Sequence, residues 1–289
     1  MLDGGRMQAK LFRRMIRRNK KRLQINQPPL NASPVFFANS FPKSGTHLLT
    51  QILKGFTQIG PAVESGLPAI VTFDGKTGRQ RSEDEILNDL KKLLPGDIAY
   101  GHLHAFPDVV NFLSQISFAT YFILRDPRDV AVSHVHYITE MEPNHAHHHY
   151  YREVLDDFDQ RLQASIEGIP PGKSRAALPN IIQRFEPYLG WLNQPEILTL
   201  HFEDLVSKQK ETLGIIFDHA LQHNFTPTCN REQAISILSK SINPQRSPTF
   251  RSGKIGAWQS CFKETHKQVF KDIAGNLLVQ LDYEDNLDW

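Results

Sequence analysis

Residues 35–56 read VFFANSFPKSGTHLLTQILKGF, and this stretch predicts a strand, a short loop and a helix in direct succession. The run at 35–39 is mostly apolar, which is typical of a strand, and Pro42 marks its end. Apolar side chains at positions 48, 49, 52, 53 and 56 then repeat at the spacing of one helix face. The loop at 41–46 is therefore expected to lie at the N-terminus of a helix.

This loop has the composition of a phosphate-binding site. A helix N-terminus offers unpaired backbone N–H groups and the positive end of the helix dipole. Gly45 allows an anion to approach the backbone, Thr46 adds a hydroxyl donor and Lys43 adds a mobile positive charge. The loop is not a Walker A motif, because its lysine precedes the glycine and no upstream glycine stands at the required place. It predicts a phosphate cradle of another kind.

Strands and helices alternate through the rest of the chain. Further strands are predicted at 97–100, 118–124 and 197–200. Further helices are predicted over 83–94, 107–115, 127–138, 151–167, 180–193, 207–222, 231–240 and 263–281. This alternation predicts an α/β fold in which a doubly wound, mostly parallel sheet carries helices on both faces. Residues 31–289 are expected to form a single domain after a basic arm and linker at 1–30.

The composition excludes several classes of protein. With 289 residues, 40% of them hydrophobic and 22% charged, the chain has the profile of a globular protein. It contains no apolar run long enough to span a membrane, and its first residues lack the apolar core of a signal peptide. Its two cysteines are too few for a disulfide framework or a cysteine zinc site, so we expect a reducing, cytoplasmic location.

The first 22 residues are strongly basic. They hold nine of the 33 Lys and Arg side chains and one acid, Asp3, which leaves the rest of the chain mildly acidic. A solvated, partly helical arm explains this pattern most simply. A surface helix for anionic lipid or nucleic acid is the alternative, but no DNA-reading motif or strong apolar stripe supports it. We therefore expect neither a nucleic acid partner nor a membrane span.

Two later segments also suit a nucleotide. The segment RDPRDVAVS at 125–133 follows the predicted strand at 118–124, so Arg125 stands at a strand's carboxyl end, where doubly wound sheets bind ligands. Its guanidinium and the Ser133 hydroxyl together suit a second phosphate. The segment FRSGKIGAW at 250–258 is a basic, glycine-rich loop that is expected to fold over a nucleotide.

Three segments, taken in this order, resemble the cofactor-binding motifs of sulfotransferases that use 3′-phosphoadenosine 5′-phosphosulfate (PAPS). They are PKSGTHLL at 42–49, RDPRDVAVSHVHY at 125–137 and RSGKIGAWQSCF at 251–262. The segment HFEDL at 201–205 is similar to another segment of that family. The resemblance extends from about residue 35 to the C-terminus and implies a P-loop-like enzyme without a metal. Such an enzyme transfers a sulfuryl group to a hydroxyl or amine of a small molecule by in-line displacement and releases 3′-phosphoadenosine 5′-phosphate (PAP).

The resemblance also implies roles for individual residues. The cofactor-binding residues would be Lys43, Ser44, Gly45, Thr46, His47, Leu48, Arg125, Ser133, Arg251, Ser252 and Gly253. Lys43 would neutralise the oxygen that bridges phosphorus and sulfur, and Ser133 would hold either that lysine or the 3′-phosphate. The chain departs from the family pattern at Leu48, where cytosolic members carry a tryptophan that stacks on adenine. Phe202 replaces a tyrosine, and Ser252 and Ala257 replace a lysine and an aspartate.

His102 is the predicted general base. It follows the predicted strand at 97–100, and a neutral imidazole suits removal of a proton from a hydroxyl or amine. It matches the histidine of the family's KTHLP segment, although Tyr100 replaces the lysine. His104 is a weaker match, and Glu64 is a third possibility because several Golgi members use glutamate.

Other interpretations stay open at this stage. The histidine-rich tract at 144–150 has no accompanying carboxylate geometry, so we predict no metal site there and expect an exposed lip of the acceptor cleft. A kinase-like phosphotransferase is disfavoured because a Walker A motif and a clear magnesium aspartate are absent. A nucleotide-binding module without catalysis remains possible because of Tyr100 and Leu48. The sequence leaves the acceptor's identity and the oligomeric state undetermined.

Overall fold

The computed structural model describes residues 2–24, 28–74, 78–247 and 253–289. The chain forms two compact units. Unit 1 comprises Met1–Leu124 and Gly190–Ser247, and unit 2 comprises Arg125–Leu189 and Pro248–Trp289. The single domain expected for residues 31–289 stays a prediction. Arg251 and Ser252, two of the predicted cofactor residues, lie outside the described residues.

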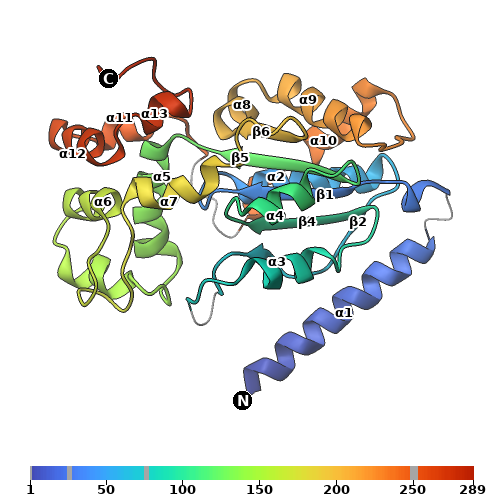
Figure 1. The fold of residues 1–289 in the computed structure, drawn as a ribbon, viewed down its shortest axis with the longest axis horizontal. Coiled ribbons are helices and arrows are strands. Elements are labelled where there is room, and N and C mark those ends of the chain that lie inside the picture. The colour runs from blue at the N-terminus through green and yellow to red at the C-terminus, as the bar shows by residue number, and fades with distance from the viewer. Residues whose placement is uncertain (1, 25–27, 75–77, 248–252) are drawn as a thin grey trace. The chain divides into compact units, whose positions relative to one another are not determined.

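A parallel sheet forms the centre of unit 1 (Figure 1). Its strands are β1 (Val35–Ser40), β2 (Val63–Glu64), β3 (Ile70–Val71), β4 (Asp97–His102), β5 (Phe118–Leu124) and β6 (Ile197–His201). They follow the order β2-β4-β1-β5-β6, with β3 also paired to β4, and every pairing between these strands is parallel. All residues of β1 and β5 are buried, as the uninterrupted apolar runs predict for central strands of a parallel sheet.

Helices cover both faces of this sheet (Figure 1). One face carries α2 (Thr46–Gly55), α9 (Gln209–Gln222) and α10 (Arg231–Ser241), and the other carries α3 (Glu83–Leu90) and α4 (Pro107–Leu113). Alternate strand residues such as Phe36, Ala38, Tyr121 and Ile123 form the core on the α2 side. The short helix α8 (Phe202–Ser207) follows β6, and single 3₁₀ turns occur at Pro28–Asn31, Phe56–Gln58 and Pro244–Arg246. The predicted α/β fold is confirmed.

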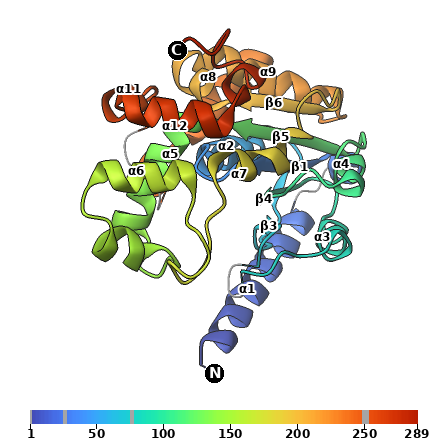
Figure 2. The same cartoon turned by 60° about the vertical axis from the view of Figure 1, so that its left-hand side comes forward.

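Unit 2 is built from helices and loops. Its helices are α5 (Pro127–His136), α6 (Phe158–Glu167), α7 (Ile181–Leu189), α11 (Trp258–Cys261), α12 (Glu264–Ala274) and α13 (Leu277–Gln280), with π-helical turns at Tyr137–Met141 and Tyr150–Val154. Within the unit, α6 packs against both α5 and α12 (Figure 2). The helix expected over 263–281 is broken at Gly275, whose φ of 52° lies in the left-handed region.

The basic arm forms one long helix, α1 (Leu2–Gln24), in unit 1. Arg18 is only 6% exposed, and its guanidinium bonds both carboxylate oxygens of the fully buried Asp97, with Nε 3.0 Å from Oδ1. Arg22 donates to the Pro95 carbonyl at 2.7 Å. The expectation of a solvated arm is therefore wrong for this side of the helix, because a buried carboxylate far along the chain requires a cation. Within the described ranges, no helix combines the length and apolar character needed to cross a membrane.

We expect Asp97→Asn to release α1 from the rest of unit 1. The substitution leaves the Arg18 guanidinium buried without its counter-charge, and loss of one member of a buried pair costs about 3–5 kcal/mol. Urea unfolding should therefore show a free energy of unfolding that is lower by this amount. The decrease becomes smaller if α1 detaches, because the Arg18 guanidinium then returns to water. Limited trypsin digestion should cut α1 faster than in the wild type.

Asp218→Asn provides the matched control, because Asp218 pairs with Arg231 on the surface of the same unit. That variant should keep the stability and the digestion rate of the wild type. Unchanged digestion of α1 in Asp97→Asn would show that this ion pair does not hold the helix.

Candidate functional site

The predicted phosphate loop lies between β1 and α2, as the sequence indicates. Its backbone takes the left-handed conformation at Lys43, with φ of 71°, and at Gly45, with φ of 98°. A Cβ atom at position 45 would lie 2.7 Å from Cδ2 of Phe202, so only glycine fits there. Among the described residues, no side chain caps the first turn of α2, whose backbone N–H groups therefore suit an anion.

The hydroxyl groups of the loop differ in their partners. Thr46 Oγ1 lies 2.7 Å from Ser40 Oγ in a buried hydrogen bond. Ser44 is fully buried, yet its Oγ has no hydrogen-bond partner in the described part of the chain. Buried hydroxyls are normally satisfied, and an orphan of this kind at a helix N-terminus is what a bound anion would satisfy. The loop thus has the features of a phosphate cradle.

His102 is the last residue of β4, and β4 runs beside β1 in parallel register. Its Nδ1 lies 3.0 Å from the Ser40 carbonyl oxygen and 3.1 Å from Ser40 Oγ. A carbonyl oxygen only accepts, so Nδ1 carries the proton and Nε2 keeps its lone pair. Burial lowers the pKa of His102 below its ordinary value of 6.5, and the nearby His47 lowers it further. The imidazole is therefore held in its neutral form, with a lone pair on Nε2 that can accept a proton.

The residues around His102 hold it in place. Asn39 is fully buried, and its side chain accepts from Leu103 N at 2.8 Å and donates to Leu103 O at 3.1 Å. The Trp191 indole N–H also donates to Leu103 O, at 2.7 Å. Sequence reasoning missed Asn39 and Ser40. Two polar residues that end an apolar strand are the signal that could have identified them.

His47 lies in the first turn of α2 and is half-buried. Burial lowers its pKa from 6.5, and the positive charges of Lys43 and Lys54 lower it further. Leu48, the next residue, packs against the core on the α2 side of the sheet. The prediction that these two residues bind the cofactor stays a prediction.

The two alternative bases have different surroundings. His104 lies edge-on to Phe73 with ring centroids 5.3 Å apart, and burial lowers its pKa to about 4. Glu64 pairs with Lys54 at 2.8 Å on the surface. The strand register places Glu64 opposite Ile98, four residues before His102, which corresponds to about 13 Å along the strand. Glu64 therefore lies away from the strand end that carries the loop and His102.

In unit 2 the second and third predicted segments contact each other. Arg125 directly follows β5 in the chain, and its Nη2 donates to Asp129 Oδ2 at 2.9 Å and to the Lys254 carbonyl at 2.7 Å. The Asp129 carboxylate is fully buried and also accepts the backbone N–H groups of Gly256, at 3.0 Å, and Trp258, at 2.9 Å. Asp129 thus organises the glycine-rich loop that is predicted to fold over a nucleotide. The sequence alone did not indicate this role for Asp129.

Arg128 supports the same loop from α5. Its guanidinium carbon lies 3.8 Å from the ring centroid of Trp258 and 4.6 Å from that of Trp289. The same guanidinium pairs with Asp126 at 2.7 Å and with Glu284. Cation–π contacts and ion pairs on one planar group hold it in a single orientation.

The remaining predicted residues are placed as follows. Ser133 is half-buried on α5, and Gly253, at the start of the last described range, has φ of 62°. In the tract at 144–150, His147 is buried and its Nε2 bonds the Ala176 carbonyl at 3.1 Å, so the expectation of an exposed lip is wrong for this residue. Across the described ranges, no group of three or more His, Cys, Asp or Glu side chains is arranged to hold a metal.

A profile of the sulfotransferase domain matches residues 120–282, which is more than half of the chain. The chain belongs to the sulfotransferase family. No curated protein sequence matches it. The matched range begins in β5 and includes the Arg125, Ser133 and Asp129 positions described above.

Solved structures similar to this family member support the fold. Retinol dehydratase in complex with androsterone and the inactive cofactor PAP is 16% identical, with a TM-score of 0.56 over 90% of this chain and 85% of that one. Mouse sulfotransferase SULT7A1 complexed with PAP is 17% identical, with a TM-score of 0.55 over 89% and 91%. Retinol dehydratase with retinol and PAP is 16% identical, with a TM-score of 0.56 over 89% and 86%. At these identities the likeness concerns the fold.

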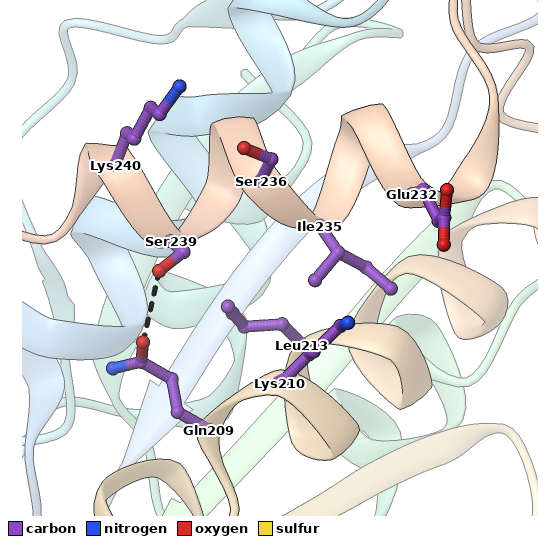
Figure 3. A pocket seen from close by; sticks show the side chains of 8 residues that line it. All are labelled: Gln209, Lys210, Leu213, Glu232, Ile235, Ser236, Ser239 and Lys240. Atoms are coloured by element: carbon purple, nitrogen blue, oxygen red, sulfur yellow. Dashed lines mark hydrogen bonds between the residues drawn. The ribbon is translucent and has the colours of Figure 1, made fainter.

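A groove lies between α9 and α10 of this sulfotransferase (Figure 3). Leu213 and Ile235 form its apolar floor, and Ser239 donates to Gln209 Oε1 at 3.0 Å across one end. None of the predicted cofactor or catalytic residues lines it. The groove therefore plays no part in the candidate site.

We expect Asp129→Asn to destabilise unit 2 and to loosen the loop at 253–258. The amide cannot accept from Arg125, Gly256 and Trp258 together, and loss of one member of a buried pair costs about 3–5 kcal/mol. Urea unfolding measures this loss, and the tryptophan emission should move to longer wavelength as Trp258 becomes more exposed.

Glu264→Gln is the control, because it makes the same chemical change at an exposed pair with Lys267 on α12. This variant should match the wild type in both measurements. Wild-type emission and stability in Asp129→Asn would mean that the carboxylate does not organise the loop.

Proposed function

We propose that this sulfotransferase moves the sulfuryl group of PAPS to a hydroxyl or amine of a small-molecule acceptor. The observation that carries the proposal is the loop at 42–47. It combines an uncapped helix N-terminus, a glycine that no other residue can replace and a buried Ser44 hydroxyl without a partner among the described residues. This donor set fits the phosphosulfate end of the donor.

Two sets of residues would recognise the two anionic ends of PAPS. The 5′-phosphosulfate would be held by Lys43 and by backbone and side-chain donors of Ser44, Gly45, Thr46 and His47. The 3′-phosphate would be held by Arg125, Ser133 and the segment 251–253. Structures of similar fold were solved with PAP, which supports this donor for the present chain.

The chemistry would follow from the tautomer of His102. As the acceptor oxygen or nitrogen forms its bond to sulfur, Nε2 takes the acceptor's proton, and the bond from sulfur to the bridging oxygen breaks. Lys43 stabilises the negative charge that develops on that oxygen, and the bonding electrons leave with PAP. The Ser40 carbonyl accepts a hydrogen bond from Nδ1–H and stabilises the imidazolium that forms.

The acceptor class is kept broad in this proposal. Retinol dehydratase was solved with androsterone and with retinol, both of which are small molecules. For the present chain we propose a small molecule with a hydroxyl or amine, and a screen of acceptors by mass spectrometry identifies the sulfated product. A sulfated product in the presence of PAPS is the direct test of the proposed function, and transfer from ATP instead would contradict it.

PAP should bind far more tightly than adenosine 5′-phosphate, which lacks the 3′-phosphate. Charge-assisted hydrogen bonds contribute about 1.5–3 kcal/mol each, so Arg125→Ala should weaken PAP binding at least about tenfold. Isothermal titration calorimetry measures both nucleotides. Ser133→Ala, which leaves the Arg125 contacts intact, should weaken PAP binding and keep the stability of the wild type.

The surface variant Arg231→Ala serves as control and should bind PAP as the wild type does. Equal affinity of the wild type for PAP and adenosine 5′-phosphate would contradict the proposal that Arg125 and Ser133 recognise the 3′-phosphate.

His102→Ala should lower turnover by about a hundredfold or more, the usual contribution of a positioned general base. PAP affinity should stay nearly unchanged, because the proposal places the imidazole on the acceptor side. His104→Ala and Glu64→Gln are the comparison variants, and both should keep most of the activity. Loss of turnover in either comparison variant, with His102→Ala active, would show that the base has been assigned to the wrong residue.

The pH dependence should follow from the pKa of His102. Burial lowers this pKa below 6.5, so the imidazole is mostly neutral, and able to accept a proton, at pH 6.5 and above. As the pH falls, kcat/KM should therefore decline with a midpoint below pH 6.5, because Nε2 becomes protonated. A midpoint above pH 6.5 would contradict this environment for the base.

A further inference from the structure

The exposed surface of α1 has a composition that the proposed reaction does not use. We propose that α1 docks this protein onto the surface of a bilayer that contains anionic phospholipids. The argument rests on three features of residues 11–24: an exposed apolar stripe, a basic flank beside it and a buried anchor that holds both in one orientation. It does not depend on sulfuryl transfer.

The apolar stripe consists of Phe12, Met15, Ile16 and Leu23. Their exposed fractions are 66%, 40%, 51% and 83%, and the four gather on one helix. At 3.6 residues per turn they fall within an arc of about 100° on the helix. A stripe of this width is what an interfacial helix inserts into the boundary between headgroups and acyl chains.

The basic flank lies next to the stripe. Arg13, Arg17, Lys20 and Lys21 are all exposed, and residues 11–24 contain no acid. On the same helical projection these cations occupy the arc that adjoins the apolar stripe on the side of Ile16. Apolar and cationic side chains side by side complement an anionic lipid surface, where each basic residue contributes about 1 kcal/mol.

The third side of α1 is its anchor. Arg18 is buried against Asp97, Arg22 bonds the Pro95 carbonyl, and the half-buried Leu11 lies on the same side. A Cβ at Gly66 would lie 3.0 Å from Cβ of Arg14, which shows how closely the helix packs there. The anchor prevents rotation about the helix axis, so the stripe and the flank stay exposed together.

Two other occupants of this surface fit less well. A nucleic acid would use the cations but would leave Phe12, Ile16 and Leu23 without apolar partners. A second copy of the chain could cover the apolar stripe, but it would bring two basic flanks together. A lipid surface satisfies both parts of α1, and a helix in the plane of the interface needs no membrane-crossing segment.

Vesicle co-sedimentation of the full-length protein tests the proposal. The vesicles consist of phosphatidylcholine alone or of phosphatidylcholine with about 30 mol % phosphatidylserine. We expect the protein to sediment with the anionic vesicles and to be released by about 0.5 M salt, which screens the basic flank. Neutral vesicles should retain little protein, because the stripe alone is short.

Two variants separate the contributions of the stripe and the flank. Phe12→Ser with Ile16→Ser should weaken binding to anionic vesicles at least about tenfold. Arg17→Gln with Lys20→Gln should weaken it by about 25-fold, from about fivefold per cation. The matched control is Ile215→Ser with Leu221→Ser, which removes two exposed apolar side chains from α9 and should bind as the wild type does. All three should keep the wild-type helix content and the activity measured without vesicles.

Equal sedimentation with neutral and anionic vesicles would overturn the proposal, as would equal binding by the wild type and both α1 variants. Absence of binding to either kind of vesicle would also overturn it. In that case, retention of RNA by the wild type in a filter assay, or a dimer in gel filtration that the stripe variant abolishes, would identify the alternative occupant of α1.

Discussion

The hydrogen bond from His102 Nδ1 to the Ser40 carbonyl joins the ends of two neighbouring parallel strands. It fixes the tautomer of the imidazole, and the Ser40 hydroxyl on the same residue bonds Thr46 in the first turn of α2. The candidate base and the candidate phosphate cradle are therefore positioned by one residue at the end of β1. Because β1 is paired on both sides and fully buried, this end of the strand has little freedom to move.

Unit 2 uses a buried carboxylate for a comparable purpose. Asp129 binds the Arg125 guanidinium and two backbone N–H groups of the loop at 254–258. A buried charge of this kind is costly unless its lone pairs are engaged in hydrogen bonds. Here the partners come from the two predicted nucleotide-binding segments, at 125–133 and 250–258. The aspartate therefore orders both segments.

Asp97 shows the same physical requirement outside the candidate site. It is fully buried at the start of β4, and the cation that compensates it comes from α1, 79 residues earlier in the chain. The basic arm is thus divided between an anchor, which satisfies a buried charge, and an exposed surface. This division is what makes α1 a defined part of the fold and gives its apolar stripe a fixed direction.

Local sequence patterns predicted the parallel α/β fold, because short continuous apolar runs such as 118–124 are typical of strands buried on both faces. They also predicted the loop at 41–46, since its residues are neighbours in the chain and need only a strand before them and a helix after them. The tertiary structure decided four other features. They are the tautomer of His102, the distance of Glu64 along β4, the role of Asp129 and the anchoring of α1. Each depends on a contact between residues far apart in the sequence, such as Ser40 and His102, which are separated by 62 positions. Strand register and burial set these contacts, and neither is visible in local periodicity.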